Sequence, residues 1–193
     1  MKRDVWKVAF AVCGVMLVAA LVAVACDSSD SAGKQYAFER MEFTFSYEVS
    51  DDLLAVADIA FSYESVDEAG EVVPVVEQLE QSPWVKNFEA TTLPADFAVQ
   101  VSATLKEGVV LDKTNYTLQY ALMEEFKEYQ SDGKVHWSET PDVENHTVTL
   151  SNDPADSAPT LAAIVAELAL MNRTFAYVVT VDPEGGYDVA DND

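Results

Sequence analysis

Apolar and polar side chains alternate with a period of two over most of the chain beyond residue 40. The clearest run is Met41–Val49, in which apolar or aromatic side chains occupy every second position and Glu, Thr or Ser the positions between them. Side chains of a β-strand point alternately to the two faces of a sheet, so this period predicts a strand with one buried face. Similar runs follow at Leu53–Tyr63, Glu71–Leu79, Trp84–Ala90, Phe97–Leu105, Tyr116–Tyr129, Val135–Ser138, Thr147–Leu150 and Phe175–Val181.

These runs predict a mostly β fold of about eight antiparallel strands. Two packed sheets are the usual way to bury the apolar faces of so many short strands, so we expect a two-sheet sandwich, immunoglobulin-like in the loose sense. About 150 residues are enough for one hydrophobic core, and we expect a single domain over residues 36–190. Tyr187 and Val189 are spaced to add one more short strand.

Turn residues and proline refine the strand order. Asp67–Gly70 is a turn signal between two of the runs and predicts a hairpin. Pro74 lies inside the second of them and predicts a strand at a sheet edge or a bulge, because proline has no backbone N–H for a second neighbour. Trp84 is the large aromatic of the next run, and we expect it to fill the core.

One segment has helical spacing instead. Leu161, Ile164, Val165 and Leu168 recur every three or four residues after a possible cap and an early proline. We therefore expect one amphipathic helix near residues 159–172.

The N-terminus has the layout of an export signal. Lys2, Arg3 and Lys7 precede residues 8–25, an apolar run without charge. Alanines at positions 23 and 25 match the small residues before a signal-peptidase site. Residues 1–25 are therefore predicted to be a signal peptide that is helical before cleavage.

Cys26 follows this run directly and supports a lipid-anchored protein. Residues 22–26 resemble a bacterial lipobox, in which the cysteine is lipidated and becomes the first residue, although the usual leucine is replaced by Ala23. Cys13 lies inside the leader, so Cys26 would be the single cysteine of the mature chain, without a disulfide partner. Plain cleavage and an uncleaved membrane anchor are the alternatives.

Residues 26–35 are small and polar and predict a flexible tether. Within it, Asp30-Ser31-Ala32 is similar to the acceptor motif of Bacteroidetes O-glycosylation, which makes Ser31 a candidate glycosylation site.

Net charge limits the partners. The chain has 11 basic and 34 acidic residues, and removal of residues 1–25 takes away three and one of these, so the mature charge is 8 − 33 = −25. So negative a protein repels phosphate backbones, and we expect no nucleic-acid binding.

No pattern of catalytic, cofactor or metal-binding residues stands out, and we expect none of these sites. His136 and His146, the two histidines, are ten residues apart with no third ligand at a typical spacing, so we expect surface histidines. Acidic loops at Asp51–Asp52, Asp67–Glu68 and Asp153–Asp156 could attract calcium, but turn carboxylates are the preferred interpretation.

Three stretches carry a family resemblance. Asp51–Asp58, Ser82–Lys86 and Leu93–Phe97 follow an aromatic first strand in an order that resembles small exported lipoproteins of gut Bacteroidales. The resemblance implies a place in the bacterial cell envelope, lipid-anchored and at the outer membrane, either on its periplasmic face or on the cell surface. It implies no chemistry.

Three functions remain from the sequence. The first is a non-catalytic interaction module, held in the membrane by the lipid on Cys26, whose partner is an unidentified protein or glycan. The second is a structural subunit of a surface assembly, fimbrillin-like, that adds strands between copies. The third, least favoured, is a surface enzyme acting on glycans.

Overall fold

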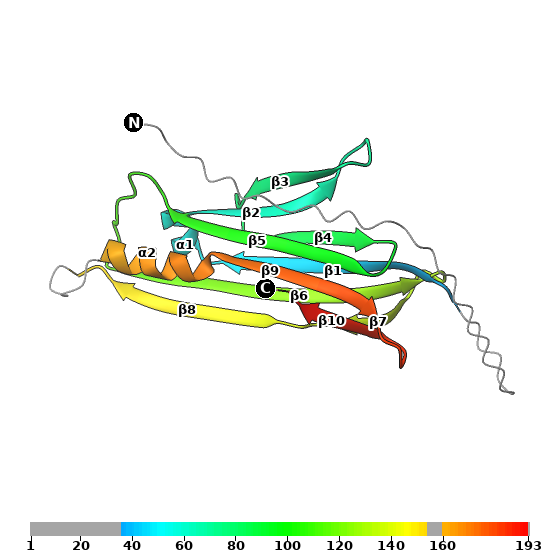
Figure 1. Ribbon diagram of the computed structural model, residues 1–193. Coiled ribbons are helices and arrows are strands. Elements are labelled where there is room, and N and C mark those ends of the chain that lie inside the picture. Colours follow the sequence, from blue (N-terminus) through cyan, green and yellow to red (C-terminus); the bar gives the residue numbers. More distant parts are fainter. Residues whose placement is uncertain (1–35, 154–159, 193) are drawn as a thin grey trace, which may run out of the picture. The chain divides into compact units, whose positions relative to one another are not determined.

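Ten strands and two short helices make up the residues that this computed structural model describes, 36–153 and 160–192 (Figure 1). The described residues belong to one compact unit, residues 35–193. The elements in chain order are β1 (Phe38–Val49), α1 (Asp51–Val56), β2 (Ala57–Val66), β3 (Val72–Gln78), β4 (Trp84–Ala90), β5 (Ala95–Leu105), β6 (Asn115–Gln130), β7 (Val135–Glu139), β8 (Val143–Ser151), α2 (Thr160–Met171), β9 (Arg173–Val181) and β10 (Tyr187–Asp191).

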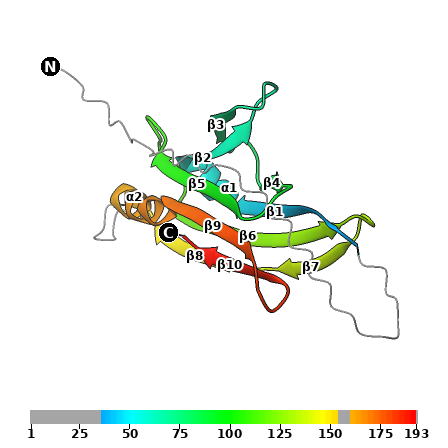
Figure 2. The ribbon, with the colours of Figure 1, turned by 45° about the vertical axis from the view of Figure 1, so that its right-hand side comes forward.

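The strands form two antiparallel sheets that lie face to face as an open sandwich (Figures 1 and 2). The first sheet has the order β4-β1-β6-β7, and β8 also pairs with β6. The long strand β6 pairs with β1 along one edge. Along its other edge it pairs with β8 over its first half and with β7 over its second half. The second sheet has the order β10-β9-β5-β2-β3. The prediction of a mostly β fold with two antiparallel sheets is confirmed.

Aromatic side chains fill the space between the sheets. Phe43 and Phe45 of β1 are completely buried, as the alternation in this strand predicts. The Phe43 ring stacks on Phe126 with centroids 4.6 Å apart, and it contacts Phe97 and Tyr177 of the opposite sheet at 5.6 and 5.8 Å. Each such pair contributes about 0.5–1.5 kcal/mol beyond the burial of its area. The core is therefore centred on β1 and β6 of one sheet and β5 and β9 of the other.

The hairpin predicted around Asp67–Gly70 is confirmed. β2 and β3 pair antiparallel from Ala60↔Gln78 to Val66↔Val72, and the Asp67 carboxylate accepts hydrogen bonds from two backbone N–H groups of the turn. Gly70 has a φ of 82°, which an L side chain rarely adopts. β3 is an edge strand, as Pro74 predicts.

The strand predicted at Leu53–Tyr63 begins only at Ala57 in the structure, and the prediction of a single helix is wrong. Residues 51–56 form the short helix α1, whose N-cap is Ser50 with its hydroxyl 3.3 Å from the Leu53 nitrogen. Leu53 and Val56, three residues apart, both point into the core. A capping serine and acidic first-turn residues favour a helix here, and the apolar spacing fits one helical turn as well as a strand.

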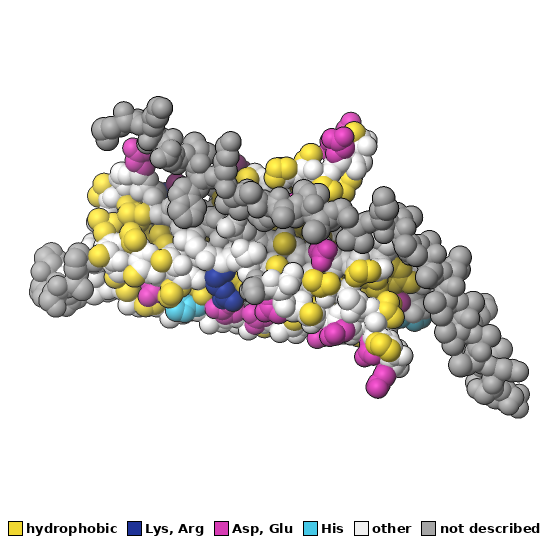
Figure 3. Space-filling model, in the orientation of Figure 1, with side chains coloured by type: hydrophobic (Ala, Val, Ile, Leu, Met, Phe, Trp, Pro, Cys, Tyr) yellow, Lys and Arg dark blue, Asp and Glu magenta, His cyan; other side chains and the backbone are white. Residues whose placement is uncertain are grey.

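The helix expected near residues 159–172 is present as α2, but it is not amphipathic, because apolar side chains cover its exposed face as well as its buried one. Ile164, Leu168 and Met171 are buried, and the helix packs against β5 and β8. Its outer face is also apolar, with Leu161, Val165 and the neighbouring alanines exposed, and apolar side chains gather over it in Figure 3. None of the described helices is long and apolar enough to span a bilayer.

β8 is longer than predicted. Only Thr147–Leu150 has clear alternation, but the strand runs over Val143–Ser151 because it pairs with nine consecutive residues of β6. Pairing with an established neighbour therefore extends a strand beyond its own sequence pattern.

Candidate functional site

The two sheets leave a groove where strands β2 and β5 separate. Their pairing ends at Tyr63↔Val99. Beyond this point β2 continues toward the hairpin tip and pairs with β3 alone, while residues 96–98 of β5 pair with β9 alone. The facing edges of β2 and β5 are therefore without a strand neighbour in the described part of the chain.

Strand β4 forms the opposite side of this groove. It pairs with β1 on one side, and no other described strand pairs with it. Five consecutive β4 residues line the groove, Lys86 to Ala90, together with Tyr63–Val66, Val72 and Asp96–Ala98. Successive side chains point to opposite faces, so five consecutive residues can line one space only if the strand edge itself faces it. The volume of about 480 Å³ is within the usual range for ligand sites.

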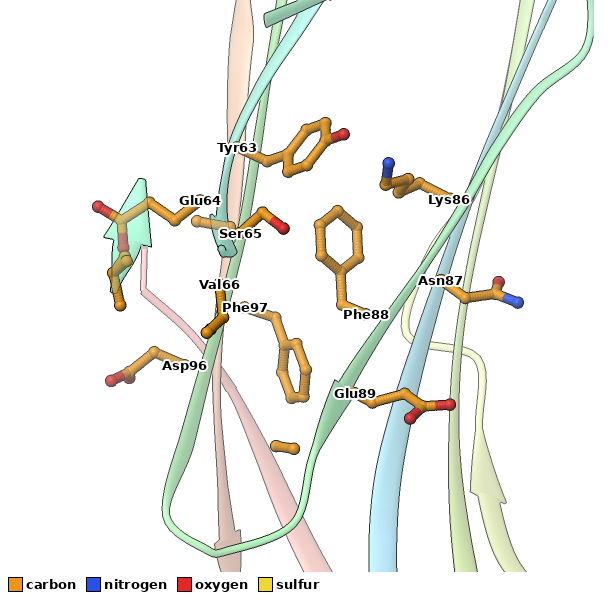
Figure 4. A pocket seen from close by; sticks show the side chains of 13 residues that line it. Tyr63, Glu64, Ser65, Val66, Lys86, Asn87, Phe88, Glu89, Asp96 and Phe97 are labelled. Atoms are coloured by element: carbon orange, nitrogen blue, oxygen red, sulfur yellow. The ribbon is translucent and has the colours of Figure 1, made fainter. Parts of the chain in front are cut away.

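Aromatic rings form the inner wall of the groove (Figure 4). Tyr63, Phe88 and Phe97 point into the space between β4 and the β2–β5 pair. The Phe88 ring meets Tyr63 edge-on with centroids 5.3 Å apart. Tyr63 and Phe97 are each only 6% exposed, whereas Phe88 is half-buried. Phe88 is therefore the main aromatic surface that a ligand could reach.

Glu77 of β3 binds two side chains of the groove lining, Tyr63 and Lys86. Its carboxylate accepts hydrogen bonds from the Tyr63 hydroxyl, from Trp84 Nε1 at 2.9 Å and from Lys86 Nζ at 2.9 Å. The hydrogen bond from Tyr63 and the one from Lys86 are the main reasons why the pKa of Glu77 falls to about 2. These hydrogen bonds join the edge strands of the two sheets, because Glu77 belongs to one sheet and Trp84 and Lys86 to the other.

Trp84 differs from its predicted role. It is half-buried rather than a central core residue, and its ring stacks on Phe61 with centroids 3.9 Å apart. Its indole N–H donates to Glu77 of β3, so Trp84 links the core ring of Phe61 to an edge strand of the sheet opposite its own.

Acidic residues flank the groove on both sides. Glu64 and Asp96 lie on the outer side of β2 and β5, and Glu89 lies on the outer side of β4 (Figure 4). The basic side chain in the lining, Lys86, is already bound to Glu77. Arg40, whose Nε lies 3.5 Å from the Glu89 carboxylate, offsets part of the charge of Glu89. The surroundings of the groove are therefore negative.

A second polar cluster joins α2 to the strands. His146 of β8 lies 2.9 Å from the Glu167 carboxylate of α2 and stacks on Tyr120, with ring centroids 5.2 Å apart. The Tyr120 hydroxyl donates to Glu144 at 3.0 Å, and Arg173 binds the same carboxylate. His146 is thus a partly exposed residue with a structural partner. His136 lies 3.0 Å from Asp132 in the β6–β7 turn.

A carboxyl group is buried in the core between the sheets. Glu124 is 0% exposed and accepts a hydrogen bond from the Tyr177 hydroxyl with one oxygen, while its Oε1 has no hydrogen-bond partner among the described residues. Desolvation raises the pKa of Glu124 to about 7 and also raises the pKa of Tyr177. Since Glu124 has no exposed surface, it cannot contact a substrate in this conformation.

In two of the acidic loops considered for calcium, an aspartate has other partners. Asp52 is bound by Lys113 and by the Thr117 backbone N–H at 2.8 Å, and Asp67 shapes the hairpin turn. Among the described residues, 36–153 and 160–192, no three His, Cys, Asp or Glu side chains are arranged to hold a metal ion.

Cys26 and Ser31 lie outside the described residues. The sequence analysis did not predict that the groove residues form a site. Their signal is the alternation in β4, which places Lys86 and Phe88 on the inward face with Trp84, but strand separation has no sequence signature. Similarly, the alternation in β6 continues through Glu124 and Glu128, two acidic residues on the core face.

Comparison with protein-family models, with curated proteins and with solved structures finds no match to this chain.

Proposed function

We propose that the protein is a cell-envelope lipoprotein that acts as a non-catalytic binding module. Residues 1–25 would be removed as a signal peptide, helical in the membrane, and Cys26 would carry the lipid at the outer membrane. Residues 26–35 would separate the domain from the bilayer. The leader, the small residues before the cysteine and the lack of a second mature cysteine support this proposal.

The observation that carries the binding role is the groove between β4 and the separated strands β2 and β5. It combines strand edges that no described strand pairs with, a partly exposed aromatic ring at Phe88 and a lysine, Lys86, that is held by Glu77. Exposed strand edges are sites where proteins add a partner or must avoid one. The domain would be immunoglobulin-like in the loose sense, a class that often presents binding surfaces, and this is an analogy of fold.

A photo-crosslinking amino acid tests the binding role. We expect this amino acid, placed at position 87 in exchange for Asn87 on the β4 side of the groove, to form discrete adducts with an envelope component under illumination. The matched control is the same substitution at Asp188, an exposed position on the edge strand β10 of the other sheet. Identical adduct patterns at both positions would argue against a role for the groove.

Lipid attachment is tested separately. Cys26→Ser should release the protein from the membrane fraction, and globomycin should make the full-length precursor accumulate. The mature N-terminus, measured by mass spectrometry, should carry the mass of diacylglycerol. A serine variant that stays membrane-bound would contradict the lipid anchor.

A structural subunit is the second candidate, and the position of β1 favours it. β1 lies between β4 and β6 and pairs with both, so its removal would open an aromatic channel in the first sheet. Cleavage between residues 49 and 50 under native conditions tests this: a subunit that exchanges strands should form polymers by size-exclusion chromatography, and a binding module should unfold or stay monomeric.

A further inference from the structure

The groove presents three backbone edges without a strand neighbour among the described residues. They are residues 86–90 of β4, residues 64–66 of β2 on the side toward β5, and residues 96–98 of β5 on the side toward β2. Backbone N–H and C=O groups on such edges hydrogen-bond to water or to an added chain. The five β4 residues span about 14 Å, the length of a five-residue strand.

The composition of the groove favours a peptide over a glycan. Sugar binding depends on flat exposed aromatic rings and many side-chain hydrogen-bond groups, but Tyr63 and Phe97 are buried and the Tyr63 hydroxyl is bound to Glu77. A peptide would instead use the strand edges for hydrogen bonds and place an apolar side chain against Phe88. β4 also has no proline, whereas the other nearby edge strand, β3, is protected by Pro74.

Charge specifies the kind of peptide. Glu64 and Asp96 are exposed on one side of the groove and Glu89 on the other. The lining contains one basic residue, Lys86, and its ammonium group is bound to Glu77. Alternate side chains of an added strand point toward the core wall and toward solvent, so apolar residues should alternate with lysine or arginine.

We infer that the groove binds an extended basic peptide segment of a partner protein, which adds to the free edge of β4 as an antiparallel or parallel strand. This inference rests on the proposed binding function and specifies its ligand. The apolar side chains of the segment face Phe88, and its basic side chains lie near Glu64, Glu89 and Asp96.

Binding is tested with a synthetic seven-residue peptide that alternates valine and lysine, added to the full chain in detergent. We expect saturable binding by isothermal calorimetry, and at least tenfold weaker binding of the same peptide with glutamate in place of lysine. Hydrogen exchange should slow for groove-facing amides of residues 86–90. Binding without protection of any of the three edges would overturn strand addition.

N-methylated peptides separate strand addition from apolar adhesion. Successive N–H groups of a strand point to opposite edges, so methyl groups on one alternate set block one edge while the side chains stay the same. We expect one of the two methylated isomers to lose at least tenfold in affinity and the other to bind like the parent. Equal affinity of both isomers would contradict the inference.

Two double variants, which change the net charge by the same amount, test the acidic flanks. Glu64→Lys with Asp96→Lys should weaken the basic peptide at least tenfold and improve binding of the glutamate peptide. The matched control, Asp58→Lys with Asp188→Lys, makes the same charge change at exposed positions outside the groove and should leave both affinities nearly unchanged. Equal weakening in both variants would show general attraction to an acidic protein.

The outcome also separates this inference from the proposed function. If Asn87 crosslinks to an envelope component but the basic peptide does not bind, the binding module stands and the inferred ligand is wrong. A neutral oligosaccharide that binds without protecting β4 amides would likewise contradict the peptide and leave the module in place. If neither crosslinking nor peptide binding occurs, both fail.

Discussion

At the scale of single residues, carboxyl groups in this protein differ in protonation because their surroundings differ. Glu77 has three hydrogen-bond donors, which stabilise its charged form and lower its pKa to about 2. Glu124 has one donor and no contact with water, so burial favours its neutral form and raises its pKa to about 7. The two groups therefore make opposite contributions to the pH dependence of stability.

Glu124→Gln should stabilise the protein at a pH of about 8. The folded pKa of Glu124 lies above its ordinary value of 4.5, so its contribution to stability is full below about 4.5 and is lost as the pH rises through about 7. A shift of this size corresponds to about 3 kcal/mol, and a neutral glutamine avoids most of that loss. Urea unfolding of both proteins at several pH values measures the difference, which should shrink toward a pH of about 4.

The matched control is Glu125→Gln. Glu125 lies on the same strand, is half-buried and is bound by Lys127. This variant keeps Glu124, so it should keep the loss of stability between a pH of about 4.5 and about 7. If Glu124→Gln retains the slope of the parent protein, the buried carboxyl group is not its source.

At the scale of elements, each strand and helix is stable because of the face that it buries. The alternation in β1 places Phe43 and Phe45 in the core, and the spacing in α2 does the same for Ile164 and Leu168. Helix α2 is apolar on both faces, yet one face is exposed. Its attachment to β5 and β8 therefore depends on a few buried side chains and on the contact between Glu167 and His146.

Ile164→Ala should lower the free energy of unfolding by about 2–4 kcal/mol, because Ile164 is completely buried and its removal leaves a cavity. Val165→Ala, the neighbouring substitution on the exposed face, should change stability by about 0.5 kcal/mol or less. Chemical unfolding followed by circular dichroism compares the two. Equal losses would mean that the outer face of α2 is covered as well.

At the scale of the whole molecule, negative charge dominates. The chain has a net charge of −23, and acidic side chains outnumber basic ones on the face in Figure 3. Like charges repel one another in the folded state, and salt screens this repulsion.

Raising NaCl from about 20 to about 200 mM at a pH of about 7.5 should raise the thermal midpoint by several degrees, because the Debye length falls below the spacing of many surface charges. Differential scanning calorimetry measures the shift. The same change near a pH of about 4 should have a smaller effect, since many carboxylates are then protonated. An equal shift at both values would indicate a salt effect unrelated to charge.

The sequence by itself determined the strands, the β2–β3 hairpin and helix α2, because period-two and helical patterns decide locally which face of an element can be buried. Pro74 also restricted β3 to a sheet edge or a bulge, and the structure has it at an edge. It could not distinguish one helical turn at residues 51–56 from the start of a strand, because Leu53 and Val56 fit both until the core packs around them.

Only the tertiary structure decided the groove. The separation of β2 from β5 after Tyr63, the free edge of β4 and the meeting of Glu77 with Lys86 depend on which strands become neighbours. Neighbours are set by contacts between residues far apart in the chain, so no local pattern contains them. The same holds for Glu124, whose burial follows from the sheet that packs over it.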